Sequence, residues 1–481
     1  MEKLTGKRIL SGTVWASVDR FAVLGLQFIV NIVLARLLTP SDFGAVGLLT
    51  IFIVVSQVFI DGGFGSALIQ KKEPTQEDYS TIFYWNLFLS IFLYALLFLF
   101  APLISKYYRM PILINILRVL GLILVIGSLQ IVQMNRQRKQ LAFKRIATVD
   151  IISYLVGAIV GIILASLEFG AWSLVFQQLT TVSISTLLLW IITRWTPSFC
   201  FSVDSFKGLL GFGGYLLLAN LLQQICSNLQ GLIIGRKFSA HEMGLYTQAK
   251  KMDDIVSYTL PNILVQVMYP VLSDCQDNDE RTKQVMHLNV QLISLFIFPL
   301  IFLLVLIAHP LFNLLYGPVW DEAVPYYEII CIGGILTCLQ NINYYEVAAV
   351  GKSSDLFWWS IFKWGMLLLL LIFGAHWGMK GMLWGMGISS LNIFVINAAL
   401  VSKYSAYKFW MQCKDFGPLL IVAGLVFILV FCLSKTLNIN VLMQAFIYCI
   451  LYCLIVILFK FDALNSVKKV ISIIHNSRQN Q

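Results

Sequence analysis

The chain has few charged side chains for its length. Only 12% of its 481 residues are Asp, Glu, Lys or Arg, whereas soluble globular proteins carry about 25%. Its nine cysteines include no close CxxC pair of the kind that binds zinc, and no glycine-rich P-loop is present for a nucleotide. Its five histidines accompany no grouping of a nucleophile with a base. These deficits exclude a water-soluble protein and argue against an enzyme, a metal site or a bound cofactor.

Long apolar runs occupy the chain instead. Hydrophobic residues make up 59% of it, and the mean hydropathy is +0.81. About fourteen segments are long enough to cross a hydrocarbon core of roughly 30 Å as helices, and none shows the polar–apolar alternation of barrel strands. We therefore predict an all-α integral membrane protein. The expected spans are 12–35, 43–64, 81–101, 112–133, 148–167, 171–193, 209–234, 241–272, 287–308, 325–349, 355–376, 380–402, 416–434 and 440–459.

Basic residues indicate how the chain crosses the membrane, because Lys and Arg concentrate on the cytoplasmic side. With the N-terminus inside, the inner segments hold 22 of the 34 basic residues and the outer loops hold 7. We predict that both termini are cytoplasmic and that the number of spans is even. The basic N-terminus precedes a segment too long and too polar for a signal peptide, so it is read as a retained first helix. The net charge of +10 reflects the same asymmetry, and nucleic acid is not an expected partner.

One short motif occurs twice, at a constant offset of two hundred residues. In each copy a hydroxyl residue, Thr39 or Ser239, is followed three residues later by an acid, as in the capping box that begins a helix. Pro40 stands at the first helical position, where its missing N–H costs nothing. The matching positions are Arg36, Thr39, Asp42 and Gly44 in the first copy, and Arg236, Ser239, Glu242 and Gly244 in the second.

The helices that precede the two copies correspond as well, since each carries polar residues on one face at spacings of seven and eleven. The first helix has Arg20, Gln27 and Asn31, and in the seventh helix Asn220, Ser227 and Gly231 hold the same three places, with Gln224 beside them. We predict two six-helix lobes, 1–200 and 201–402, followed by two further helices and a cytoplasmic tail in 403–481. Parallel repeats of this kind enclose a binding site near the bilayer midplane, which is the architecture of a transporter.

Three stretches resemble a known family. They are "LARLLTPSDFGAVGL" at 34–48, "DGGFGSALIQKKEPTQEDYSTIFYWN" at 61–86 and "LLYGPVWDEAVP" at 314–325. The chain is similar to the bacterial polysaccharide exporters, the Wzx-type flippases of O-antigen, capsule and exopolysaccharide pathways. They belong to the superfamily of multidrug, oligosaccharidyl-lipid and polysaccharide exporters.

The resemblance implies a function as well as a fold. The expected substrate is an oligosaccharide linked through pyrophosphate to undecaprenol, moved by alternating access from the cytoplasmic to the outer leaflet of the inner membrane. The expected partners are this lipid, the membrane lipids and the polysaccharide polymerase machinery. A cation-coupled multidrug exporter of the same superfamily is the alternative. Such an exporter needs cavity carboxylates, whereas the charges within these apolar segments lean basic.

Charged residues within the spans are the first candidates for binding, because each costs about 2.5–3.5 kcal/mol or more to insert. Arg20, on the polar face with Gln27 and Asn31, is expected to bind the diphosphate; pairing with a distant carboxylate is the other interpretation. Asp19 is the candidate for coupling to Na⁺ or H⁺. Lys250 and Lys251 present either cations to the phosphates or, through the spacing of Lys250 and Asp254, an internally neutralised segment. The residues leave these two alternatives open.

Amides and aromatic rings suit sugars, which offer hydroxyl groups and apolar faces. The tenth span ends in such a cluster, with Asn343, Tyr344 and Glu346 among its members. The alternative is an aromatic belt with polar residues at the membrane interface. Asn220 and Gln224 complete the set of expected substrate contacts. Lys363, in a tryptophan-rich stretch, is expected to be an interfacial anchor rather than a cavity cation.

Overall fold

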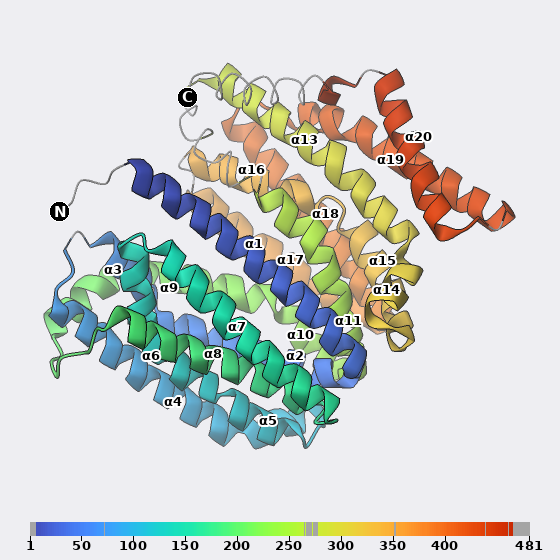
Figure 1. Cartoon of the computed structure of the whole chain (residues 1–481). Helices are drawn as coiled ribbons and strands as arrows, with labels where there is room; N and C mark the ends of the chain where they lie inside the picture. The colour runs from blue at the N-terminus through green and yellow to red at the C-terminus, as the bar shows by residue number, and fades with distance from the viewer. Residues whose placement is uncertain are drawn as a thin grey trace. The chain divides into compact units, whose positions relative to one another are not determined.

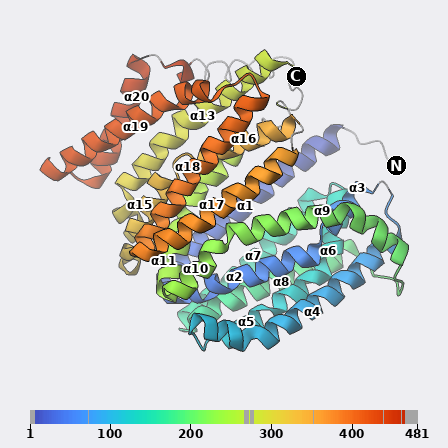
Figure 2. The ribbon, with the colours of Figure 1, turned by 180° about the vertical axis from the view of Figure 1, so that it is seen from behind.

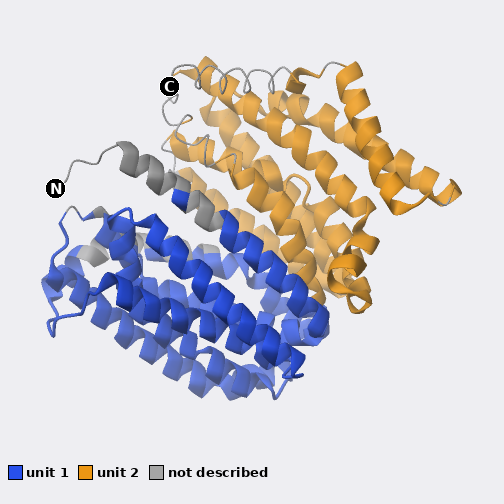
Figure 3. Cartoon of the chain, in the orientation of Figure 1, with its two compact units in different colours: residues 1–244 blue, residues 245–481 orange. Residues whose placement is uncertain are grey.

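The computed structural model describes residues 6–71, 73–263, 265, 272, 278–350, 353–437, 439–459 and 461–464. Within these ranges the side chains of residues 6–14, 16–20, 66, 70, 209–216, 218–220, 223, 353 and 354 are not described. The described residues form helices and their connections, with no strand among them (Figure 1). The chain divides into two compact units, Met1–Gly244 and Leu245–Gln481 (Figure 3). The lobe boundaries expected near 200 and 402 stay a prediction.

The first unit contains ten helices within its described residues and the first turn of an eleventh. The ten are α1 (Gly6–Leu37), α2 (Pro40–Asp61), α3 (Phe64–Gln70), α4 (Gln76–Tyr108), α5 (Leu113–Leu120), α6 (Leu122–Lys139), α7 (Phe143–Ser166), α8 (Ala171–Thr193), α9 (Val203–Ser227) and α10 (Leu229–Lys237). The eleventh, α11 (Ala240–Asp254), crosses into the second unit. A core of Phe64, Ile82, Phe83 and Val132 ties α3 and α4 to α6.

The second unit continues α11 with a short π-helix, η1 (Ile255–Thr259). Its other described elements are α13 (Asp279–Leu306), α14 (Ala308–Tyr316), η2 (Pro318–Ala323), α15 (Val324–Gly333), α16 (Thr337–Ala349), α17 (Ser353–Gly374), η3 (Ala375–Trp377), α18 (Gly378–Tyr404), α19 (Phe409–Leu437) and α20 (Val441–Leu458). α17 and α18 pack side by side and turn back at η3 (Figure 2). The last two helices attach to α13, where the Tyr452 hydroxyl donates to the Leu295 carbonyl oxygen at 3.1 Å.

The helices are apolar enough to cross a membrane, as the sequence predicts. Nine in the described part of the chain meet the length and hydropathy expected of a span, and α15 with α16 adds a tenth if this pair, bent by 41°, counts as one. α11, with 15 residues, is not in this set. The all-α membrane class is therefore confirmed, while the total of about fourteen spans stays a prediction.

The expected single span 209–234 is wrong in one respect, because α9 ends at Ser227 and α10 begins at Leu229. Asn228 separates them, and its side-chain amide donates to the Gln224 carbonyl oxygen at 2.9 Å. Asparagine side chains that bond to nearby backbone groups compete with the regular helical ladder. The polar face of this helix thus lies at a helix break.

Both copies of the repeated motif begin helices. The Thr39 hydroxyl accepts from the backbone N–H of Asp42 at 3.4 Å, and the Asp42 carboxylate accepts from the Thr39 N–H at 2.9 Å. Pro40 is the first residue of α2. In the second copy the Ser239 hydroxyl accepts from the Glu242 N–H at 3.2 Å. The capping predicted for Thr39 and Ser239 is confirmed.

The glycines that end the two motifs bring the motifs into contact with each other. A Cβ atom at Gly44 would lie 1.7 Å from the carbonyl oxygen of Ala240, and one at Gly244 would lie 1.8 Å from that of Pro40. All four residues belong to the first unit. The relation is reciprocal, so the first turns of α2 and α11 meet backbone to backbone. Only glycine permits such a close approach.

We expect Gly44→Ala to destabilise the protein, because the added methyl group forces the two backbones apart. Overpacking of this kind costs about 1–3 kcal/mol. Gly25→Ala is the matched control, since a Cβ atom there would meet nothing within 4 Å and alanine favours a helix. Thermal unfolding in detergent should show a lower Tm for the Gly44 variant alone. Equal Tm values for the two variants would contradict the contact.

Candidate functional site

A cavity of about 270 Å³ with a mixed apolar and polar lining lies in the first unit, between α2, α6 and α8. Amides, one carboxylate and one guanidinium share its wall with apolar side chains. The lining residues are Gln57, Asp61, Ile123, Gly127, Gln130, Ile131, Met134, Asn135, Arg138 and Val182. Such a mixture can bind hydroxyl groups through the amides and the carboxylate, and a phosphate through the guanidinium.

The turn after α2 holds the carboxylate of this cavity in place. Gly62 and Gly63 adopt left-handed conformations, with φ of 55° and 71°, which glycine reaches without strain. Gly65 follows in α3, and a Cβ atom there would lie 2.7 Å from the amide nitrogen of Asn135 and 3.0 Å from the Asp61 carboxylate. The sequence "DGGFGS" therefore lets α3 press against Asp61 and Asn135 at the cavity wall.

Three cations end α6, and they have different surroundings. The Arg136 guanidinium lies over the rings of Tyr79 and Trp195, 5.1 and 5.4 Å from their centres. The Lys139 ammonium donates to the carbonyl oxygens of Leu68 and Ile69, both at 3.1 Å, and so caps the end of α3. Arg138 lines the cavity. Among these three, Arg138 is the residue placed to meet a ligand.

The structure describes only some of the polar side chains predicted on the first and seventh spans. Asp19 and Arg20 lie in α1, and Asn220 lies in α9, but their side chains are outside the description. Gln27 is exposed, whereas Asn31 and Gln224 are half-buried. None of the described members of this set lines the α2–α6–α8 cavity. Their roles, including ion coupling at Asp19, stay predictions.

The structure favours the neutralised alternative for Lys250. Its ammonium lies 2.8 Å from the Asp253 carboxylate and 2.6 Å from that of Asp254. Asp253 is buried and also accepts from the Ser257 hydroxyl at 2.6 Å. Lys251, on the neighbouring side of α11, is exposed. A contact of either lysine with substrate stays a prediction.

The cluster at the end of the tenth span separates into interior and surface residues. Asn343 is buried and donates to the Gln412 amide oxygen at 3.0 Å, which joins α16 to α19. Glu346 is buried too, while Tyr344 is exposed and packs edge-on against Tyr345. Asn343 thus has a structural contact, and sugar binding by these residues stays a prediction.

The interfacial position predicted for Lys363 is wrong. The residue is 5% exposed, and its ammonium donates to the Asn397 amide oxygen at 2.8 Å. Asn397 in turn donates to the Gln340 carbonyl oxygen at 3.3 Å. Its position in a tryptophan-rich stretch suggested the interface, but the polar groups of α16 and α18 offer partners that the sequence alone does not connect.

A known protein family matches the part of the chain that contains this cavity. Residues 33–325, more than half of the chain, match the family described as polysaccharide biosynthesis protein. The chain belongs to this family. All residues that line the α2–α6–α8 cavity fall within the matched range, as do the three stretches that carry the resemblance seen in the sequence.

Two relatives resemble this chain in sequence, and one solved structure resembles it in fold. The teichuronic acid biosynthesis protein TuaB of Bacillus subtilis (strain 168) is 26% identical over 373 residues, which cover 77% of each chain. The succinoglycan biosynthesis transport protein ExoT of Rhizobium meliloti (strain 1021) is 24% identical over 417 residues, 86% of this chain and 82% of ExoT. The lipid II flippase MurJ in an inward closed conformation has the same fold, with a TM-score of 0.74, 15% identity and coverage of 94% and 100%.

Sequence reasoning about this family member missed the cavity. Arg138 lies in a basic run that the charge rule assigns to an inner loop, yet α6 continues to Lys139. Gln130 and Asn135 could have indicated the cavity, because their amides interrupt an otherwise apolar span. Gln57 and Asp61 are four residues apart and therefore lie on one face of α2, the face that lines the cavity.

We expect Lys250→Ala to destabilise the protein, because it leaves the buried Asp253 carboxylate without its cation. Breaking a buried ion pair costs about 3–5 kcal/mol, and the partial exposure of Lys250 places this case near or below the lower limit. Lys251→Ala, which removes an exposed side chain, serves as the control. Thermal unfolding in detergent measures both. A Lys250 variant as stable as the control would show that the pair has no structural role.

Proposed function

We propose that the protein is a flippase that moves undecaprenyl-pyrophosphate-linked oligosaccharides from the cytoplasmic to the outer leaflet of the inner membrane. The cavity lined by Arg138, Asp61 and the amides of α2 and α6 carries this proposal. Family membership and the functions named for TuaB, ExoT and MurJ support it. The protein then acts in surface polysaccharide synthesis as a transporter and not as an enzyme.

The chemistry of the cavity fits a sugar with a phosphate group attached. Gln57, Gln130 and Asn135 offer both donors and acceptors, which sugar hydroxyls require. The Ser185 hydroxyl donates to the Gln130 amide oxygen at 2.7 Å, and this bond orients the amide. The Arg138 guanidinium supplies a fork of donors that matches phosphate oxygens. We assign the first contact with the head group to these side chains.

The proposed orientation places this cavity near the cytoplasmic side. With the N-terminus inside, α2 runs inward and ends at Asp61, and α6 runs inward and ends at Lys139. Both cavity-lining acid and base therefore stand near the leaflet where the lipid-linked sugar is made. Arg20 and Asn31 of α1 remain our candidates for the next contacts, and Asp19 remains the candidate for coupling to Na⁺ or H⁺.

A cation-coupled multidrug exporter is the second candidate. Asp61 favours it, because a carboxylate in a partly apolar cavity is what a cationic drug requires. Arg138 on the same wall opposes it, since a like charge repels such a drug. The contrast between anionic and cationic ligands therefore tests the proposal directly.

We expect Arg138→Gln to weaken binding of undecaprenyl-diphosphate-linked N-acetylglucosamine about tenfold to a hundredfold. A hydrogen bond to a charged group contributes about 1.5–3 kcal/mol, and 1.4 kcal/mol is tenfold in affinity. Arg145→Gln is the control, because Arg145 is an exposed arginine of the same basic stretch. Equilibrium binding to the purified full-length protein, followed by flipping in proteoliposomes, measures the effect. Arg20→Ala is assayed in parallel.

The cationic dye rhodamine 6G provides the opposing ligand. Binding and transport of the dye, with no binding of the sugar lipid, would reject the flippase and favour the multidrug exporter. Loss of sugar-lipid binding in Arg20→Ala but not in Arg138→Gln would move the phosphate site from α6 to α1. Unchanged binding in both variants would reject a phosphate contact at either residue.

A further inference from the structure

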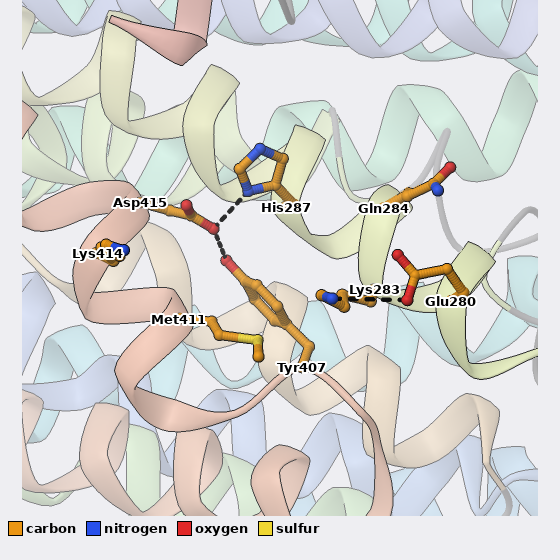
Figure 4. A pocket seen from close by; sticks show the side chains of 8 residues that line it. All are labelled: Glu280, Lys283, Gln284, His287, Tyr407, Met411, Lys414 and Asp415. Carbon is orange, nitrogen blue, oxygen red and sulfur yellow. Dashed lines mark hydrogen bonds and ion pairs between the residues drawn. The ribbon is translucent and has the colours of Figure 1, made fainter.

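A second cavity, of about 330 Å³, lies in the second unit where α13 and α19 begin (Figure 4). One helical face of α13 and one of α19 form its walls, and the link before α19 contributes Tyr407. The lining residues are Glu280, Lys283, Gln284, His287, Tyr407, Met411, Lys414 and Asp415. The α2–α6–α8 cavity shares none of them, and no role in transport is assigned to them above.

Two side chains, those of His287 and Tyr407, contact the Asp415 carboxylate. A ring nitrogen of His287, Nδ1, lies 2.7 Å from the Asp415 carboxylate, and the Tyr407 hydroxyl donates to the same oxygen. Burial and the neighbouring Asp415 raise the pKa of the Tyr407 phenol, so the hydroxyl keeps its proton. A carboxylate partner favours the charged imidazolium form of histidine. The second ring nitrogen of His287 points away from Asp415 (Figure 4).

The lining of this cavity contains three basic and two acidic side chains, and Asp462 also acts on His287. Lys283, His287 and Lys414 are its cations, while Glu280 and Asp415 are its anions. Glu280 lies 3.5 Å from Lys283, and both side chains are substantially exposed. Helix N-termini add partial positive charge, and both walls begin here, α13 at Asp279 and α19 at Phe409. The basic side chains and the helix N-termini can therefore meet an anionic head group.

The face of α19 that carries Lys414 continues as an apolar stripe. Ile421, Leu425 and Ile428 follow Lys414 at spacings of seven, eleven and fourteen residues, which keeps them on one helical face. Their side chains are 56–62% exposed. Trp410, 79% exposed at the start of α19, is of the type that settles at the level of lipid head groups. A cationic cavity thus stands at one end of a stripe that suits acyl chains.

We propose that this cavity binds the phosphodiester head group of an anionic membrane lipid, whose acyl chains lie along the Ile421–Ile428 face of α19. The phosphate meets Lys283 and Lys414, while Asp415 holds the His287 ring beside them. In the orientation proposed above the site faces the cytoplasmic leaflet, where anionic lipids concentrate. This lipid is distinct from the transported one, because its head group carries one charge and no diphosphate.

The test measures lipid binding to the purified full-length protein in detergent. Phosphatidylglycerol and phosphatidylcholine are titrated separately, and native mass spectrometry counts the bound lipids. We expect the double variant Lys283→Gln, Lys414→Gln to lose roughly tenfold or more in affinity for phosphatidylglycerol, because two charge-assisted contacts disappear. Binding of phosphatidylcholine should not change. Lys435→Gln, near the opposite end of α19, is the matched control and should bind like the wild type.

Several outcomes would overturn the proposal. Equal affinity for the two lipids in the wild type would remove the role of the negative charge. An undiminished preference for phosphatidylglycerol in the double variant, or an equal loss in Lys435→Gln, would place the lipid elsewhere. Displacement of phosphatidylglycerol by inorganic phosphate at equal concentration would show a site for free phosphate instead. None of these measurements uses the transported sugar lipid, so they are independent of the flippase assay.

Discussion

Hydrocarbon cannot solvate a polar group, and every charge within a span must therefore find its partner inside the protein. Three polar side chains of the second unit illustrate this constraint. Lys250 lies between two aspartates, Lys363 donates to an amide, and Asn343 donates to Gln412. Lys363 thereby joins α17 to α18 and Asn343 joins α16 to α19, whereas the ion pairs of Lys250 lie within α11. Arg138 differs, because it lines a cavity and can be satisfied by a bound molecule.

The sequence predicts best what local chemistry decides. Thr39, Pro40 and Asp42 begin α2 as expected, because a capping box acts within four residues. The membrane class follows from composition in the same way. The repeat at an offset of two hundred residues was visible too, but the meeting of its two copies was not. That contact depends on the tertiary fold, and a motif shows only that glycine is required, not what approaches it.

The parts of the site that sequence reasoning missed share one cause. Charge patterns place a residue inside or outside the membrane, but they do not show which way a side chain faces. Arg136, Arg138 and Lys139 look equivalent in the sequence, yet they meet aromatic rings, a cavity and the end of a helix. Lys363 was misplaced for the same reason. The break at Asn228 arises from competition between a side chain and the backbone, which hydropathy does not register.

The contact between Gly44 and Gly244 has a mechanical consequence. Most helix contacts interlock side chains, so separating them requires rotamers to change and exposes apolar area. Here backbone faces backbone, and neither glycine has a rotamer to rearrange or a side chain to dehydrate. Forming this contact between the first turns of α2 and α11 therefore costs no side-chain entropy at either glycine. The contact thus restrains the starts of two helices from far apart in the sequence without fixing a side-chain rotamer at either glycine.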